Sequence, residues 1–183
     1  NYVASLVLMG LAAQGDPALA MQVATVREWL TTNQWSQAKG VSPRDDWFGG
    51  AGYGRNGRPD LSNTQLMLDA LHDAGVSPDD PAVQRALVFV QRTQNTKANP
   101  APWAQAGGAD GGFIYTPANG GESFASEDAG EGRYGEKMPE GAPRSLRSYG
   151  SMTYAGFKSM LYAGLAPDDQ RVKDAFAWIR AHY

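Results

Sequence analysis

One segment pattern occurs three times in this sequence, and the repetition constrains the fold more than any other feature. The second copy follows the first by 60 residues, from Leu8 to Leu68, and the third follows the second by 89 residues, to Phe157. The same two spacings align a glycine in each copy and continue beyond it without a gap. The aligned positions are Leu11, Leu71 and Met160; Gly15, Gly75 and Gly164; Val23, Val83 and Val172; Val26, Ala86 and Ala175; Trp29, Phe89 and Trp178.

Each copy has the pattern of two amphipathic helices joined at the glycine. In the second copy, Leu68 and Leu71 share one helical face, and Gly75 stands where a helix ends, because glycine adopts the left-handed conformation freely. Asp80 and Pro81 then supply the N-cap and the first-turn proline of the next helix. The sequence therefore predicts an all-α fold of three helical hairpins, over residues 1–35, 60–95 and 149–183.

Two long stretches separate the hairpins. Residues 36–59 and 97–147 are rich in Gly, Pro and charged residues, which predicts inserted loops within a single domain of residues 1–183. Loops of this length are usually functional or partly disordered. Only residues 112–116 have the pattern of a short extended piece, and the acidic stretch from Glu122 to Glu140 predicts a solvated loop.

Composition excludes several classes of function. The formal net charge of −3 gives no electrostatic case for nucleic acid or for an anionic membrane surface. No apolar run reaches the roughly 18 residues of a transmembrane helix. The chain has no cysteine, which excludes disulfides, thiolate nucleophiles and thioester chemistry. We expect no cofactor, and cytoplasmic, periplasmic and secreted locations all fit.

Two short motifs carry a family resemblance. Gln34-Trp35 is followed by Trp47-Phe48-Gly49-Gly50, and Gln94 is followed by Asp110-Gly111-Gly112-Phe113. These motifs resemble the glutamine–tryptophan repeats of squalene–hopene cyclases and the related repeats of prenyltransferases. The resemblance covers nearly the whole chain and implies an α/α toroid, or partial α/α barrel. In that family the glutamine closes a helix end and the aromatic residue packs on the next repeat.

The resemblance also implies a place for the chemistry. The family's proton donor is the middle aspartate of a D-x-D-D-T motif, and the matching stretch here is Asp60-Leu61-Ser62-Asn63-Thr64. Ser62 stands at the position of the acid, and a hydroxyl cannot protonate an alkene, so we expect the cyclisation chemistry to be altered or lost. The family's prenyltransferase zinc site needs a cysteine that is absent. If the protein is an enzyme, it resembles a terpene cyclase or mutase, with Asp60 as the candidate acid or base.

By the same resemblance, the loops before the inner helices line the mouth of a central cavity. Their residues here, in 52–64 and 145–154, form a polar and aromatic set, which favours a ligand other than a bare hydrocarbon. Trp103, in the long loop, has no counterpart in the other copies and is a candidate ligand contact, with an anchor for the loop as the alternative interpretation. The remaining candidates are Tyr53, Arg55, Ser62, Asn63, Arg147, Ser148, Tyr149, Thr153 and Tyr154.

Simpler interpretations stay open at each site. Asp60 and Ser62 can serve only as helix caps. Asp69, His72 and Asp73 have the spacing of metal ligands, but His72 aligns with apolar residues of the other copies, so no metal site is predicted. The alternative to an enzyme is a non-catalytic scaffold on the same toroid that binds a protein or a small, isoprenoid-like molecule.

The number of repeats predicts a partner. Three hairpins cannot close a ring that uses about six in the family. We therefore expect other repeats of a longer chain, or a second copy of this one, to complete it.

Overall fold

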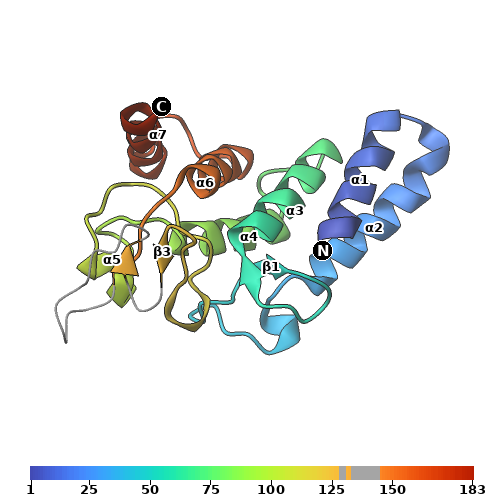
Figure 1. Ribbon diagram of the computed structural model, residues 1–183. Helices are drawn as coiled ribbons and strands as arrows, with labels where there is room; N and C mark the ends of the chain where they lie inside the picture. The colour runs from blue at the N-terminus through green and yellow to red at the C-terminus, as the bar shows by residue number, and fades with distance from the viewer. Residues whose placement is uncertain (128–130, 133–144) are drawn as a thin grey trace.

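The computed structural model of the chain describes residues 1–127, 131–132 and 145–183. The protein is predominantly helical, as predicted, and its long helices pair into three hairpins (Figure 1). These helices are α1 (Tyr2–Gln14), α2 (Ala20–Asn33), α3 (Leu61–Asp73), α4 (Pro81–Arg92), α6 (Gly150–Tyr162) and α7 (Gln170–His182).

The three hairpins are built in the same register. The first helix of each hairpin has 13 residues. The glycine after it is left-handed every time, with φ of 62° at Gly15, 72° at Gly75 and 84° at Gly164. The second helices α4 and α7 are N-capped by Asp80 and Asp169, whose carboxylates accept hydrogen bonds from the backbone N–H two residues later. The hairpins that repeat in the sequence at spacings of 60 and 89 residues therefore also repeat in the structure.

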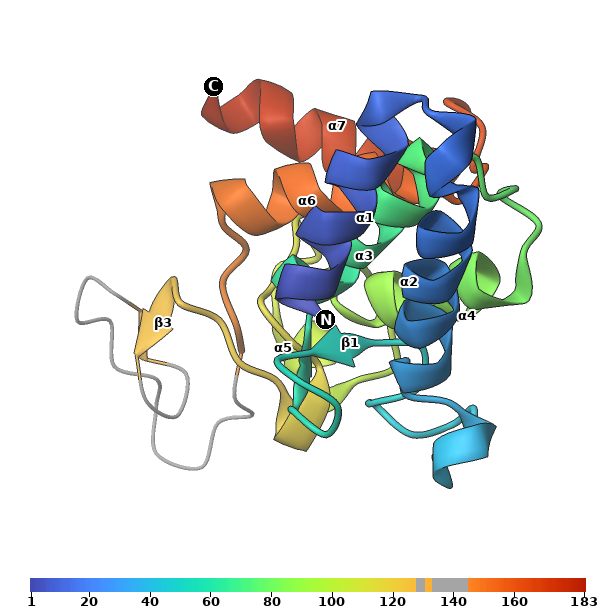
Figure 2. The same ribbon diagram turned by 90° about the vertical axis from the view of Figure 1, so that its right-hand side faces the viewer.

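The hairpins lie side by side in chain order. Helix α1 packs against α3, and α3 packs against α6, while α2, α4 and α7 each pack on the first helix of their own hairpin (Figures 1 and 2). Within the described residues, only the middle hairpin has another hairpin packed on each side.

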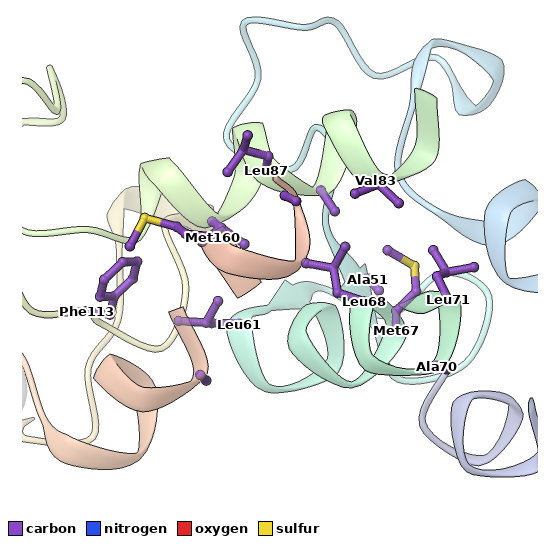
Figure 3. Close-up of a cluster of buried hydrophobic side chains, with 14 of the residues drawn as sticks. Ala51, Leu61, Met67, Leu68, Ala70, Leu71, Val83, Leu87, Phe113 and Met160 are labelled. Carbon is purple, nitrogen blue, oxygen red and sulfur yellow. The ribbon is translucent and has the colours of Figure 1, made fainter. Parts of the chain in front are cut away.

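The main hydrophobic core fills the space between the helices (Figure 3). It includes Leu68 and Leu71 of α3, Val83 of α4, Met160 of α6 and the loop residue Phe113, all of them buried. A second, smaller cluster lies under the long loop and contains Trp103, Ala104, Ile114 and Leu146.

The stretches between hairpins hold more regular structure than the sequence predicted. Strand β1 (Ala51–Gly52) pairs antiparallel with β2 (Pro59–Asp60), and β3 (Ser126–Glu127) pairs with β4 (Glu131–Gly132). Short helical pieces occupy η1 (Pro17–Leu19), η2 (Gln37–Lys39), α5 (Pro102–Ala106) and η3 (Ala118–Gly120). Buried backbone groups need partners, and these loops supply them to one another. Most of the acidic stretch lies outside the described residues.

Candidate functional site

A buried glutamine joins the first hairpin to the second. The Gln34 side chain donates from Nε2 to the carbonyl oxygens of Gly49 and Ala82, at 2.8 and 2.9 Å. Its Oε1 accepts from Nε of Arg85 at 3.0 Å. One side chain thus ties the end of α2 to the following loop and to the first turn of α4. We call this contact the first junction.

The second junction repeats the first between the second and third hairpins. Nε2 of Gln94 donates to the carbonyls of Gly111 and Arg171, at 3.0 and 2.8 Å. Ala82 and Arg171 are each the second residue of their helix, so the two glutamines bind equivalent carbonyls. Both glutamines are almost fully buried. A hydrogen-bonded amide therefore holds each hairpin to the next one.

A glycine completes each junction. Gly49 and Gly111 are left-handed, with φ of 83° and 85°. A Cβ on Gly49 would lie 1.8 Å from the carbonyl oxygen of Arg85, and one on Gly111 would lie 2.5 Å from that of Asp174. No side chain fits at either place, so these glycines allow the loops to touch α4 and α7.

Two equivalent threonines anchor the loops to the first helices of the second and third hairpins. The hydroxyl of Thr64 accepts from the backbone N–H of Ala51 at 2.9 Å, and that of Thr153 accepts from Phe113 at 3.1 Å. Each hydroxyl also donates to the carbonyl four residues earlier. The sequence assigned Thr153 to a cavity mouth, but the residue is buried and holds the loop in place.

Asp60 is a buried helix cap. Its exposed fraction is 2%, and its Oδ1 accepts from the backbone N–H of Asn63 at 2.8 Å. Oδ2 accepts from Nδ2 of Asn63, also at 2.8 Å, and the hydroxyl of Tyr115 donates to the same carboxylate. Two of the predicted site residues, Asp60 and Asn63, are therefore brought together as partners in one cap, with Ser62 half-buried between them.

Opposing effects act on the Asp60 carboxyl. Burial raises its pKa, whereas the hydrogen bonds from Asn63 and Tyr115 and the charge of Arg58 lower it, and the net direction is upward. Burial also raises the pKa of Tyr115, with the Asp60 charge as a further cause, so the phenol keeps its proton and donates. The result is a sealed polar pair rather than an acid open to a ligand.

Several other predicted site residues make contacts of their own and take no part in the cap at Asp60. Tyr53 is exposed and stacks on Tyr2 with ring centroids 6.2 Å apart. Arg55 is exposed, and Trp103 is buried in the small second cluster, where it anchors the loop. Tyr154 meets Tyr183 edge-on, at 5.5 Å.

The structure therefore does not bring all of the predicted site residues together in one place. Neighbouring residues on a helix point about 100° apart. Although they are neighbours in the sequence, Thr153 is therefore buried, whereas Tyr154 is 46% exposed. The order of residues along the loops could not reveal this separation.

Three predicted residues do gather around one cleft. Arg147, Ser148 and Tyr149 line a cleft of about 610 Å³ beside the N-terminus of α6 and the C-terminus of α7. Its other walls include Asn95, Asp110, Trp178, His182 and Tyr183.

Asp110 makes one wall of this cleft rigid. Its Oδ1 accepts from the backbone of Gly112 at 3.0 Å and from Oγ of Ser148 at 2.8 Å. Its Oδ2 accepts from the indole Nε1 of Trp178 at 3.2 Å. The carboxylate thereby fixes Ser148 and Trp178 relative to each other.

The cleft exists where the first junction has two tryptophans. There, Trp35 follows the glutamine, packs edge-on against Trp47 at 4.8 Å, and donates from Nε1 to the carbonyl of Gly57 at 2.9 Å. At the second junction the equivalent residues are Asn95 and Ala109, both much smaller. Asn95, which lines the cleft, therefore fills less space than the indole ring of Trp35 does at the first junction.

Asn95 is the functional candidate that sequence reasoning missed. It is 2% exposed, and its Oδ1 has no hydrogen-bond partner among the residues that the structure describes. A buried acceptor without a partner is unusual and is often met by a ligand or water. The sequence does contain a signal for this residue. Aligning Gln34-Trp35 with Gln94-Asn95 places the small amide of Asn95 at the position of the large indole ring of Trp35.

Two further findings concern metal ions and membranes. Among the described residues, no group of His, Cys, Asp and Glu is arranged to hold a metal ion. In the same part of the chain, no helix has the length and apolar character needed to cross a membrane.

Comparison of the chain with protein-family models, with curated proteins and with solved structures gives no match in any of the three.

Proposed function

We propose that this chain is part of an α/α toroid of the terpenoid-cyclase-like type, and that it serves as a scaffold for binding a small molecule rather than as a proton-initiated cyclase. Three hairpins that stack in chain order through the same glutamine junction support the toroid. The observation that carries the binding function is the cleft at the second junction, where Asn95 stands in the place of a tryptophan.

The lining of the cleft suggests the class of ligand. Asn95 lines the cleft, and its buried Oδ1 lacks a hydrogen-bond donor among the described residues, so a donor such as a hydroxyl group would suit it. The rings of Trp178 and Tyr183 offer apolar faces for a ring-shaped body. A cyclic alcohol, including a cyclised isoprenoid alcohol, has both features. Leaving the acceptor unpaired costs about 1–3 kcal/mol, which a matching donor would recover.

The surroundings of Asp60 argue against cyclisation. Ser62 occupies the position of the family's acid, and Asp60 is almost fully buried with donors on both carboxylate oxygens. An acid that protonates an alkene must touch it, and this carboxyl faces its own helix cap instead.

Ligand-observed NMR with paired cyclic alcohols and their parent hydrocarbons tests the proposal. We expect the alcohols to bind about tenfold more tightly than the hydrocarbons, because only they satisfy Asn95. Asn95→Leu should remove this preference, Asn95→Asp should keep it, and Asn95→Trp should abolish binding by refilling the cleft. Asn56→Leu, in an exposed loop, is the matched control.

Two results would overturn the binding proposal. One is wild-type protein that binds none of the alcohols. The other is Asn95→Leu and Asn95→Trp proteins that are folded and bind the alcohols as the wild type does, which would place the ligand elsewhere.

A second candidate function is acid catalysis by Asp60, and the upward pKa shift caused by burial favours it. Incubation with squalene followed by mass spectrometry of cyclised products tests this alternative. We expect no product. A product that disappears in Asp60→Asn would replace the scaffold proposal with an enzymatic one.

A further inference from the structure

The first hairpin leaves an apolar surface uncovered. Val3, Leu6 and Val7 of α1 are 71, 46 and 45% exposed. Together with Val26 and Trp29 of α2 they form the N-terminal face of the row of hairpins. The residues at the positions of Val3 and Val7 in the other hairpins are all buried, namely Asn63, Met67, Met152 and Gly156.

The same surface is hollowed. An open groove of about 540 Å³ runs between α1 and α2, and its lining is almost entirely apolar. Tyr53 borders the groove from the loop that follows the first junction. In the second and third hairpins the preceding hairpin covers the corresponding surface.

The third hairpin leaves the opposite side uncovered. Tyr154 and Leu161 of α6 and Phe176 of α7 are 46, 38 and 50% exposed, and Phe157 stacks on Phe176 at 6.1 Å. These four residues form the C-terminal face. Phe157 and Phe176 take the positions of Leu68 and Leu87 in the middle hairpin, and both of those leucines are buried in the core.

Neither end of the row is capped in the usual way. Terminal repeats of a stacked array normally carry a polar outer face, because that face meets water. Here both faces are apolar, and each is the surface that a neighbouring hairpin covers elsewhere in the molecule. Equivalent surfaces already pack against each other within the chain, where α1 contacts α3 and where α3 contacts α6.

We propose that two copies of the chain associate head to tail, with the C-terminal face of one copy docked on the N-terminal face of the other. The α3–α6 contact supplies the geometry. A second copy is the fitting occupant because one chain carries both faces. This inference rests on the repeat alone and is independent of the cleft at the second junction.

The repeat also predicts the character of the new contact. At the internal contact, Nζ of Lys158 pairs with Oδ2 of Asp69 at 2.9 Å. Lys158 itself takes the position of Asp69 in the docking copy, and Met9 takes the position of Lys158 in the receiving copy. No ion pair forms there, so the association depends on apolar burial, and moderate salt should not weaken it.

Analytical ultracentrifugation of two single-face variants tests the proposal. Val7→Glu places a charge on the N-terminal face, and Phe176→Glu places one on the C-terminal face. Burying an unpaired charge should weaken self-association by roughly 100-fold or more in each variant. The decisive sample is their equimolar mixture, because it contains one undamaged face of each kind. We expect the mixture to form a 1:1 heterodimer while each variant alone stays monomeric.

Ala177→Glu is the matched control, because Ala177 lies on the side of α7 opposite the buried Ala175. This variant should self-associate as the wild type does, and circular dichroism should show all three variants folded. Asn95→Leu should also associate normally, so a failure of the binding proposal and a failure of this one can be told apart.

Three outcomes would overturn the inference. A wild-type chain that is monomeric across the accessible concentration range would show that the faces do not dock. A variant mixture that stays monomeric, or a single-face variant that still dimerises alone, would indicate a symmetric contact instead. A monomeric wild type whose groove binds the isoprenoid alcohol farnesol, with loss in Val7→Glu, would make the groove a ligand site.

Discussion

The two junctions share one frame and differ in what fills it. Each has a buried glutamine bound to the second helix of the next hairpin and a left-handed glycine against the backbone of that helix. The first junction contains two tryptophans that pack edge-on, whereas the second has Asn95 and a cleft. The comparison shows which positions hold hairpins together and which are free to vary, and the free ones are where a ligand can be accommodated.

We expect the largest effect on stability from adding one methyl group to Gly49, where the loop touches α4. Gly49→Ala places a Cβ 1.8 Å from a backbone oxygen in a left-handed conformation, and we expect a loss of more than about 4 kcal/mol in the free energy of unfolding. Gly111→Ala, at 2.5 Å, should cost less. Urea denaturation followed by circular dichroism measures both variants.

Gly54→Ala is the control for this pair, because Gly54 is left-handed with open space around it. It should cost only about 1–2 kcal/mol, the penalty of the conformation itself. If Gly49→Ala is no more harmful than this control, the close approach of the first junction does not matter for stability.

The glutamines should rank next. Gln34→Leu removes three hydrogen bonds and Gln94→Leu removes two, and each leaves two carbonyls with one donor fewer. We expect losses of about 3–4 and about 2–3 kcal/mol respectively, measured by urea denaturation. Gln22→Leu, on the exposed surface of α2, should change little. Equal effects of all three substitutions would contradict the proposed importance of the junctions.

Replacing Trp35 of the first junction with asparagine, the residue found at the second, should make the two junctions more alike. Trp35→Asn removes a half-buried ring and should lower the free energy of unfolding by about 2 kcal/mol, while opening a second cleft. The dissociation constant of a cyclic alcohol, measured by calorimetry, would show whether the new cleft binds. The exposed Thr32→Asn serves as a control, and a variant as stable as wild type would show that the indole is not holding the loop.

The smallest effect concerns pH and the cap at Asp60. A carboxyl whose pKa is raised by folding contributes stability that is present below its unfolded pKa and lost as the pH rises through the folded value. Asp60→Asn should therefore show a smaller decline in stability than wild type from the unfolded pKa upward, by about 1 kcal/mol or less. Parallel melts across that range measure the difference, and superimposable pH profiles would contradict it.

Local patterns predicted the hairpins well. The helix bounds follow from apolar spacing and from glycines such as Gly75, and the cap at Asp60 follows from its position before α3. Both depend on residues close together in the chain. The arrangement of the three hairpins as a toroid stays a prediction.

The cleft could not be predicted in the same way. Its walls come from Asn95, from the loop around Asp110, from residues 145–150 and from the end of α7. No residue pattern along the chain marks an open space. The cleft is recognised only when the two junctions are compared position by position.

The glutamine junction has a consequence for how the chain is made. The amide of Gln94 is matched by the carbonyl of Arg171, which lies 77 residues further along the sequence. During synthesis, Gln94 can therefore complete its hydrogen bonds only after the third hairpin has emerged from the ribosome. A chain interrupted before α7 would keep the bond from Gln94 to Gly111 and lack the bond to Arg171.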